Sequence, residues 1–387
     1  MLRITVNHVF GKALGSAENS HPMEIRSASV YRFSLPLAHT LDTRSGELEQ
    51  REGLILILNQ DEDMIGLGEI SPLPGFSQDS LSSALSKTVQ TIQRVTESEQ
   101  QLAEFINRGG DWEQVGEPSI ANYGIETALL SLLARTNGTD LGKMLFGETS
   151  QRIPLNGLIN TELADWVPTA QHLIDAGYRT LKVKVGRINH ELEALGIRSI
   201  RQAIGPEIGL RLDGNRSWDL ETAIQFGNLL KSENVEYIEE PLNRPEDLPI
   251  FYDECGLHFA LDETLHHILD PSISFQSYTG LKALILKPTL VACMPRIIEL
   301  VGQAREQGIQ AVMSSSYESD VGLNILAQLA AGISGEAYAV GLGTRNVYSS
   351  HLSKRSPHIQ DGWMEIQSLS VNDLDLDSCE LVFEKYV

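Results

Sequence analysis

Two lysines one residue apart, Lys182 and Lys184, stand in the strand-like run TLKVKVG at residues 180–186. Side chains of a strand alternate between its two faces, so both ammonium groups are expected on the same face. Like charges at that separation destabilise each other, and each lowers the pKa of the other. A lysine whose pKa falls towards neutrality can act as a general base. The pair therefore predicts proton-transfer chemistry, against the alternative of a solvated edge strand.

Acidic side chains close three later strand-like runs. Asp213 follows GLRL, Glu239 follows VEYI, and Asp262 follows HFAL. Three carboxylates that converge on one point need a cation, because their repulsion otherwise raises their pKa until some become neutral. Oxygen ligands without His or Cys suit a hard ion, so we predict Mg²⁺, with Mn²⁺ as the alternative. The competing interpretation is that these carboxylates pair with the lysines or with Arg211.

A third lysine, Lys287, follows the run ALIL beyond these carboxylates. Lysines before and after the acidic set would face opposite sides of a bound substrate. With a cation to hold a substrate carboxylate, the natural reaction is removal of a proton from the neighbouring carbon, because the cation stabilises the resulting enediolate.

Short strand-like runs recur along the second half of the chain, with helix-like segments such as 164–177, 220–233 and 294–308 between them. The runs begin at positions 153, 180, 209, 235, 258, 283, 310 and 337. Near-constant spacing of eight such units predicts an α/β fold, a TIM-like barrel of parallel strands closed by helices, rather than a doubly wound open sheet. Active sites of such barrels lie at the carboxyl ends of the strands, where the reactive residues fall.

The first part of the chain has a different pattern, with strand-like runs followed by helical stretches, which is typical of an α+β domain. We expect residues 1–23 to form an N-terminal extension and 24–148 an α+β capping domain. The barrel is expected over 149–350, and the C-terminal segment 351–387 is expected to pack back on the capping domain. The segment 36–52 is expected to close over the barrel mouth.

The composition limits the binding partners and the cellular compartment that we expect for this protein. A formal net charge of -22 argues against nucleic acid or an anionic membrane as partner. The cysteines lie far apart and form no CxxC pair, which fits a reducing compartment. No apolar run has the length of a membrane span, and the first residues lack the pattern of a signal peptide. We therefore expect a cytoplasmic protein with a small-molecule carboxylate substrate, and a homo-oligomer remains open.

Small residues at the ends of the last two runs are candidates for substrate binding. Ser314 and Ser316 lie in the triple serine after the seventh run, and Gly341 and Gly343 lie in the GLGT loop. Loops after the seventh and eighth strands of many barrels bind anions through backbone N–H groups. Ordinary Gly/Ser turn chemistry is an equally good reading of these residues.

Five motifs in order resemble the muconate-lactonising subgroup of the enolase superfamily: K-x-K in LKVKVG, D-x-N in RLDGN, then IEEP, LDET and LILKP. Within that subgroup, EISPLPGFS, SSSYESDVGLNILAQLAA and the late GLGT are similar to the o-succinylbenzoate synthase family of menaquinone biosynthesis. The resemblance runs from about residue 24 to the C-terminus. It implies an enolase-type barrel with an N-terminal capping domain.

The resemblance also implies roles for single residues. The residues that would bind Mg²⁺ are Asp213, Glu239 and Asp262. Lys184 would be the acid/base residue, Lys287 its partner across the substrate ring, and Lys182 the supporting lysine. The residues that would surround the ligands and the bases are Arg211, Asn215, Glu240 and Glu263.

The implied reaction is dehydration of 2-succinyl-6-hydroxy-2,4-cyclohexadiene-1-carboxylate to 2-succinylbenzoate, which makes the chain a lyase. A racemase of N-succinylamino acids or a dipeptide epimerase is the alternative, because lysines on opposite faces suit 1,1-proton transfer. Dipeptide epimerases usually carry Asp-x-Asp at the eighth strand, where this chain reads VGLGT, which disfavours that branch. Muconate cycloisomerisation is a weaker option. A non-catalytic ligand-binding barrel would have lost a lysine or an acidic ligand, and all are present.

Overall fold

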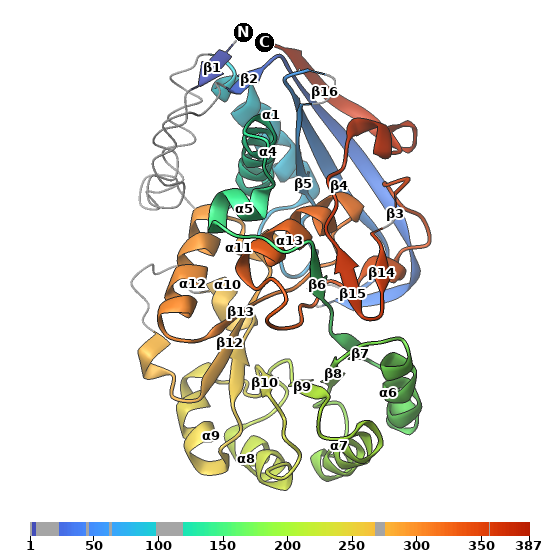
Figure 1. The fold of residues 1–387 in the computed structure, drawn as a ribbon, viewed down its shortest axis with the longest axis vertical. Helices are drawn as coiled ribbons and strands as arrows, with labels where there is room; N and C mark the ends of the chain where they lie inside the picture. The colour runs from blue at the N-terminus through green and yellow to red at the C-terminus, as the bar shows by residue number, and fades with distance from the viewer. Residues whose placement is uncertain are drawn as a thin grey trace.

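A computed structural model describes residues 2–4, 23–43, 46–61, 64–97, 119–267, 275–355 and 357–387. Figure 1 shows two parts: an antiparallel sheet with helices lies at the end that holds both termini, and a barrel of strands and helices lies at the other end. Most of the expected extension 1–23 lies outside the described residues. The proposed domain bounds, 24–148 and 149–350, remain a prediction.

The barrel wall is one parallel sheet of seven strands, in the order β13-β12-β11-β10-β9-β8-β7. The strands are β7 (Gly157–Ile159), β8 (Thr180–Lys184), β9 (Gly209–Asp213), β10 (Tyr237–Glu239), β11 (Phe259–Leu261), β12 (Leu281–Leu286) and β13 (Gln310–Met313). Sequence order and spatial order coincide, which is the arrangement of a TIM-like barrel.

The barrel closes through single bridges rather than through a full eighth strand. Ser314 bridges to Gly341 and Leu155 bridges to Val340, both in parallel. The eighth predicted run, from position 337, therefore lies between the two edges of the sheet. The first predicted run is divided: β6 (Arg152–Pro154) pairs with β15 (Trp363–Glu365) outside the barrel, and only β7 joins the wall.

Helices follow most strands and cover the outside of the barrel. They are α6 (Trp166–Asp175), α7 (His190–Ile204), α8 (Leu220–Leu229), α9 (Leu248–Cys255), α10 (Glu263–His267), α11 (Pro288–Val291), α12 (Met294–Glu306) and α13 (Asp320–Ile333). Side-chain caps define several starts, since the carboxylate of Asp219 accepts a hydrogen bond from the Thr222 N–H at α8, and Asn189 caps α7 in the same way.

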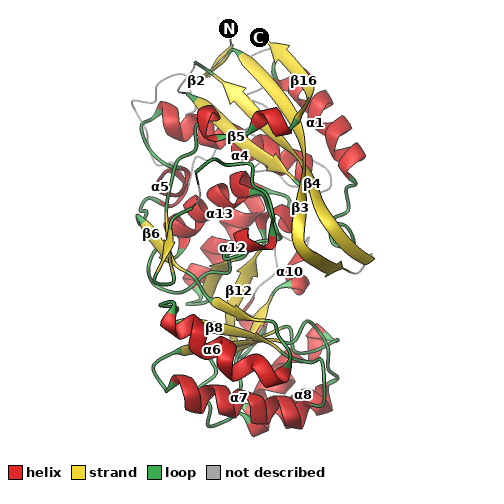
Figure 2. Cartoon of the chain, turned by 90° about the vertical axis from the view of Figure 1, so that its right-hand side faces the viewer, coloured by secondary structure: helices red, strands yellow, loops and turns green. Residues whose placement is uncertain are grey.

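The capping domain is built on a four-stranded antiparallel sheet in the order β16-β3-β4-β5. The elements are β3 (Ser27–Thr43), β4 (Gly46–Asn59), β5 (Ile65–Ile70), β16 (Glu380–Tyr386), α1 (Leu81–Val95), α4 (Ile120–Thr136) and α5 (Leu141–Phe146). The C-terminal strand β16 pairs with β3, so the end of the chain lies in this sheet. Figure 2 shows the long β3–β4 hairpin running from the termini towards the barrel.

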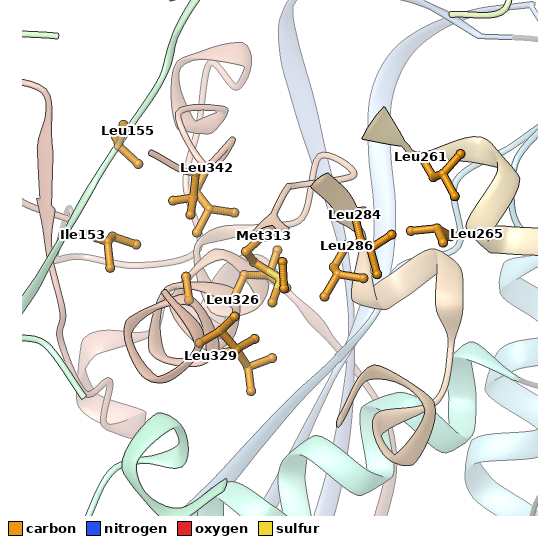
Figure 3. Close-up of a cluster of buried hydrophobic side chains, with 14 of the residues drawn as sticks. Ile153, Leu155, Leu261, Leu265, Leu284, Leu286, Met313, Leu326, Leu329 and Leu342 are labelled. Carbon is orange, nitrogen blue, oxygen red and sulfur yellow. The ribbon is translucent and has the colours of Figure 1, made fainter. Parts of the chain in front are cut away.

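Both faces of this sheet are buried. Leu54, Leu56 and Leu58 of β4 pack in a cluster with α1 and α4, while the alternate residues Ile55 and Ile57 join the main core of the barrel. That main core includes the side chains drawn in Figure 3, among them Leu284 and Leu286 of β12 and Leu326 of α13. Burial on both faces makes the sheet a structural partner of the barrel.

Smaller elements complete the described chain. They are β1 (Leu2–Ile4), which pairs with β2 (Met23–Ile25), β14 (Ile359–Gln360), which pairs with β15, and 3₁₀ turns at Leu163–Asp165, Pro245–Asp247, Phe275–Ser277, Arg345–Val347, Val371–Asp373 and Leu376–Ser378. Within the described ranges, we find no helix with the length and apolar character needed to cross a membrane.

Helix α4 lies unusually close to β5, because glycines face each other across the contact. A Cβ placed on Gly68 would come within 1.9 Å of the Gly124 carbonyl oxygen, a distance that no side chain accommodates. The exposed Gly302 of α12 is the opposite case, since a Cβ there meets nothing within 4 Å.

We expect Gly68→Ala to lower the free energy of unfolding by about 1–3 kcal/mol or more, because helix and strand must separate to admit the methyl group. Gly302→Ala, the matched control, is expected to raise it by about 0.5–1 kcal/mol through helix propensity. Urea unfolding followed by circular dichroism measures both. A Gly68→Ala protein as stable as the wild type would contradict the close packing.

Candidate active site

Strand register brings the predicted lysines and carboxylates to the same face of the sheet. Lys184 is the parallel partner of Asp213, and Asp213 is the partner of Glu239. Asp262 comes directly after β11, the strand next to β10. Because paired residues of neighbouring strands point the same way, these side chains all lie inside the barrel at its carboxyl end. Asp213, Glu239 and Asp262 are 1–2% exposed.

The lysines lie on opposite sides of the acidic set. Lys182 and Lys184 belong to β8, and Lys287 follows β12, with β9, β10 and β11 between them. In a closed barrel, strands separated in this way face each other across the interior. A planar substrate held above the carboxylates would therefore meet a lysine on each face.

Each carboxylate contacts a lysine ammonium. The Lys182 Nζ atom lies 3.2 Å from Asp213 Oδ2 and 3.0 Å from Glu239 Oε2. Lys184 Nζ lies 2.7 Å from Asp213 Oδ2, and Lys287 Nζ lies 2.5 Å from Asp262 Oδ2. The ion-pair interpretation and the metal interpretation thus use the same residues.

These contacts set the pKa values of the lysines. Burial alone would lower the pKa of Lys182, but Glu239 and Asp213 outweigh it and hold that pKa well above its usual range. The pKa of Lys287 is also raised, because Asp262 and Glu263 outweigh its burial. Lys182 is therefore held protonated by these carboxylates, and its expected role as the lysine that supports Lys184 stays a prediction.

The pKa values of the carboxylates shift in opposite directions. Burial raises the pKa of Glu239 to about 7, even though Lys182 opposes the shift, and the neighbouring Asp213 adds to it. For Asp213 the ammonium groups of Lys182 and Lys184 outweigh burial, so its pKa is lowered. Glu263 has a raised pKa from burial and from Asp262. Repulsion between the carboxylates therefore contributes to the raised pKa values of Glu239 and Glu263, in spite of the neighbouring lysines.

The donor set fits a hard divalent cation in its chemistry. Asp213, Glu239 and Asp262 offer only carboxylate oxygens, buried at adjacent strand ends, and an ammonium already lies between two of them. As the side chains stand, no three His, Cys, Asp or Glu residues in the described part of the chain enclose a common point tightly enough to form a ligand shell. Lys182 and Lys287 occupy carboxylate oxygens that a bound ion would use.

The residues expected around the ligands have different contacts. Asn215 accepts a hydrogen bond from Lys184 Nζ at 2.6 Å and donates to Glu263 Oε1 at 3.1 Å, so it links Lys184 to Glu263. Glu240 accepts from the backbone N–H of Asp262 at 2.9 Å and so orients that residue's peptide.

Arg211 lies deeper in the barrel. Its guanidinium donates to Glu236 Oε2 and to the Ala339 carbonyl, both at 2.7 Å, and lies 5.0 Å from the ring of Tyr237. It therefore supports the barrel interior below the acidic set.

Three of the four small residues proposed for substrate binding have their backbone donors occupied. The N–H groups of Ser314 and Gly341 donate to Leu286 and Met313 carbonyls, and that of Ser316 donates to Glu318. The Ser316 hydroxyl, which is buried, has no hydrogen-bond partner among the described residues. Any contact from Ser316 to an anion would therefore use its hydroxyl. For Gly343 the structure shows only that a Cβ would meet nothing within 4 Å.

Two groups of residues near this site went unnoticed in the sequence. Arg51 and Glu69 reach the loop after β13 from the capping domain. Arg187 follows β8 and donates to Asn160, which follows β7 at the same end of the barrel. Arg187 could have been found, since it lies in the loop directly after the lysine strand. Arg51 lies in the segment 36–52 and Glu69 begins the EISPLPGFS motif, but their contacts with the loop after β13 could not be predicted, because nothing local connects them to residues so distant in the chain.

Two family models match the chain. The model described as "Enolase C-terminal domain-like" matches residues 165–370, and "MenC, N-terminal domain" matches residues 25–132. The first range covers the barrel from the residue before α6 onwards, and the second covers most of the capping domain.

Among curated proteins, the o-succinylbenzoate synthase of Enterobacter sp. (strain 638) is 32% identical over 350 residues, which is 89% of this chain and 99% of that protein. The o-succinylbenzoate synthase of Aliivibrio salmonicida (strain LFI1238) is 32% identical over 349 residues, 89% of this chain and 98% of that protein.

Solved structures show the same fold at low identity. The L-Ala-D/L-Glu epimerase from Bacillus subtilis has a TM-score of 0.77 at 18% identity, covering 91% of this chain and 99% of that one. The N-succinyl Arg/Lys racemase from Bacillus cereus ATCC 14579 has a TM-score of 0.72 at 19% identity, covering 94% and 100%.

Proposed function

The chain belongs to the o-succinylbenzoate synthase family of the enolase superfamily, and from this premise we propose how its site works. The reaction is the dehydration of 2-succinyl-6-hydroxy-2,4-cyclohexadiene-1-carboxylate to 2-succinylbenzoate in menaquinone biosynthesis. The observation that carries the proposal is the match over 99% of a curated synthase, capping domain included. The barrel by itself is shared with epimerases and racemases. The chain is therefore a lyase with a small-molecule substrate.

Membership of the superfamily implies dependence on a divalent metal, and we propose Mg²⁺, with Mn²⁺ as the alternative ion. Asp213, Glu239 and Asp262 would hold it. The ion, when bound, supplies positive charge that holds the ring carboxylate and favours the charge that develops there.

Lys184 is proposed to remove the proton from the ring carbon next to the carboxylate. The C–H bond breaks, its proton goes to Lys184 Nζ, and its electron pair passes towards the carboxylate. The bond from the ring to the hydroxyl then breaks, and Lys184 returns the proton so that water leaves. The net change is loss of one water and formation of an aromatic ring.

Residues around Lys184 prepare it for this task. Its ammonium is held between Asp213 Oδ2 and Asn215 Oδ1, at 2.7 and 2.6 Å, so the nitrogen is fixed at the edge of the acidic set. Withdrawal of Asp213 towards a bound cation would release the Lys184 nitrogen from this contact. Lys287, on the opposite side, would place its charge over the other face of the ring.

The alternative function is racemisation of N-succinylamino acids. The observation in its favour is the position of Lys184 and Lys287 on opposite sides of the barrel, which suits removal of a proton from one face and its return to the other. Dehydration needs a base on one face only. Both reactions begin with the same proton abstraction.

A spectrophotometric assay with purified protein and Mg²⁺ tests the proposal directly. We expect rapid loss of the diene absorbance of the cyclohexadiene substrate. In parallel, N-succinylamino acids in deuterated water report exchange at the α-carbon by mass spectrometry. Dehydration much faster than exchange supports the synthase. Exchange without dehydration, in folded and metal-loaded protein, would replace it with the racemase.

A further inference from the structure

The loop that follows β13, Ser314–Ser319, is held from the capping domain by a buried arginine. Arg51 of β4 is 2% exposed. Its Nε donates to the Tyr317 carbonyl at 3.1 Å, and its two terminal nitrogens donate to the Pro72 and Ser71 carbonyls at 2.8 and 2.9 Å. Among the described residues, no carboxylate lies within ion-pair distance of this guanidinium. Arg51 thus donates three hydrogen bonds to backbone carbonyls, and one of these carbonyls, that of Tyr317, belongs to the barrel.

The peptide that Arg51 holds has an unfavourable backbone conformation. Tyr317 has φ +61°, in the left-handed region that costs a residue with a side chain about 1 kcal/mol. Its carbonyl also accepts a hydrogen bond from the Tyr348 hydroxyl at 2.6 Å. Two donors from distant segments therefore bind one carbonyl. These hydrogen bonds stabilise the left-handed conformation of Tyr317, which is unfavourable for the loop by itself.

Two buried carboxylates hold the rest of the loop. Glu318 accepts from the Ser315 hydroxyl at 2.6 Å and from the Ser316 N–H at 2.8 Å. Glu69 of β5 accepts from the N–H groups of Ser319 and Gly322 at 3.0 and 2.8 Å, at the start of α13. The capping domain therefore contacts the loop at two points, through Arg51 and through Glu69.

The held segment begins next to the strand of Lys287 and carries a hydroxyl without a partner among the described residues. The Ser314 N–H donates to the carbonyl of Leu286, the residue before Lys287, so the loop begins beside the strand of the second lysine. Ser316, two residues further along, has its buried hydroxyl without a partner in the described part of the chain. A polar atom in that state favours a ligand that supplies the missing hydrogen bond.

We propose that Arg51 is a positioning residue: by holding the Tyr317 peptide, it places the Ser316 hydroxyl for contact with the substrate, so that docking of the capping domain determines substrate affinity. The proposal rests on the proposed function, since it takes a carboxylate substrate of this site as the ligand. It assigns to Arg51, at the end of the segment 36–52, an effect on binding through an interior contact with the barrel.

The test compares Arg51→Met with two other variants. Tyr348→Phe removes the second donor to the Tyr317 carbonyl, together with the contact of that hydroxyl with Arg51, and is the milder change. Arg32→Met is the matched control, because Arg32 of the neighbouring strand pairs with Glu52 at 2.7 Å, and both side chains are partly exposed. Thermal unfolding reports the stability of all three.

We expect Arg51→Met to raise KM about tenfold or more, and Tyr348→Phe to raise it about fivefold, with kcat changed by less than about threefold. Their effects should be less than multiplicative in the double variant, because both donors act on one carbonyl. Arg32→Met should leave KM and kcat unchanged. A fall in stability with unchanged KM would make Arg51 a purely structural residue and overturn the proposal.

Amide hydrogen exchange of the peptide covering residues 314–322 gives a readout independent of turnover. Faster exchange there in Arg51→Met and Tyr348→Phe, but not in Arg32→Met, supports the positioning role. Unchanged exchange overturns it. If the wild type shows no dehydration while exchange responds as expected, the proposed function fails and the interior contact stands. If Arg51→Met does not fold, Tyr348→Phe decides by the same two measurements.

Discussion

Replacement of Lys184 by alanine is expected to lower kcat for dehydration by about 10³-fold or more, since a positioned general base contributes about 10²–10⁴-fold and here also returns the proton. The amine lies between Asp213 and Asn215, so its loss removes the proposed base together with these two contacts. The assay is loss of diene absorbance under saturating Mg²⁺ and substrate.

Lys184→Arg sharpens this prediction. Arginine keeps the positive charge beside Asp213, but its guanidinium stays protonated and cannot accept a proton. We therefore expect it to be nearly as inactive as the alanine variant. Lys282→Ala is the control, because Lys282 lies on β12 and is exposed. Substantial turnover by the arginine variant would exclude Lys184 as the base.

Removal of divalent metal is expected to lower turnover below about 1% of the original rate, and Mg²⁺ should restore it. The reason is the charge of the site: a substrate carboxylate can approach Asp213, Glu239 and Asp262 only if a cation lies between them. EDTA treatment, dialysis and readdition of Mg²⁺ measure this. Full activity in metal-free protein would contradict the metal role.

Asp213→Asn tests the same point at one residue. The amide keeps the shape but loses the charge, so we expect Mg²⁺ affinity to fall about tenfold or more, as measured by titration calorimetry without substrate. Excess Mg²⁺ should then recover activity only in part. Asp253→Asn, an exposed substitution on α9, is the control. Equal Mg²⁺ affinity in Asp213→Asn and wild type would exclude Asp213 as a ligand.

The barrel and the residue types of the site could be read from the sequence because both are local properties. The runs predicted at 180, 209, 235, 258, 283 and 310 contain β8 to β13, each beginning within two residues of the expected position. Strand ends are where apolar runs stop, so Lys184, Asp213 and Glu239 could be placed at one end of the sheet without coordinates.

The ends of the barrel were less well predicted, because pairing decides them. The run from 153 reads as one strand, yet β6 pairs with β15, some 210 residues later, and only β7 enters the wall. The run from 337 satisfies its backbone through single bridges, since it must fit between two existing edges. Neither of these pairings can be predicted from the local pattern of apolar and polar residues.

The ionisation of the site also needed the tertiary structure. Two neighbouring lysines favour a lowered pKa when considered alone, but the actual contacts of Lys182 with Glu239 and Asp213 raise it, because opposite charges at about 3 Å outweigh burial. Only coordinates give those distances.

The sequence by itself therefore determined the barrel, the chemical types of the proposed bases and ligands, and the end of the sheet at which they lie, since each follows from short-range periodicity. The tertiary structure alone decided how the capping domain meets the site. Arg51 and Tyr317 are 266 residues apart, and Glu69 and Ser319 are 250 apart. Hydrogen bonds across such separations follow from the packing of two domains, and no local pattern encodes them.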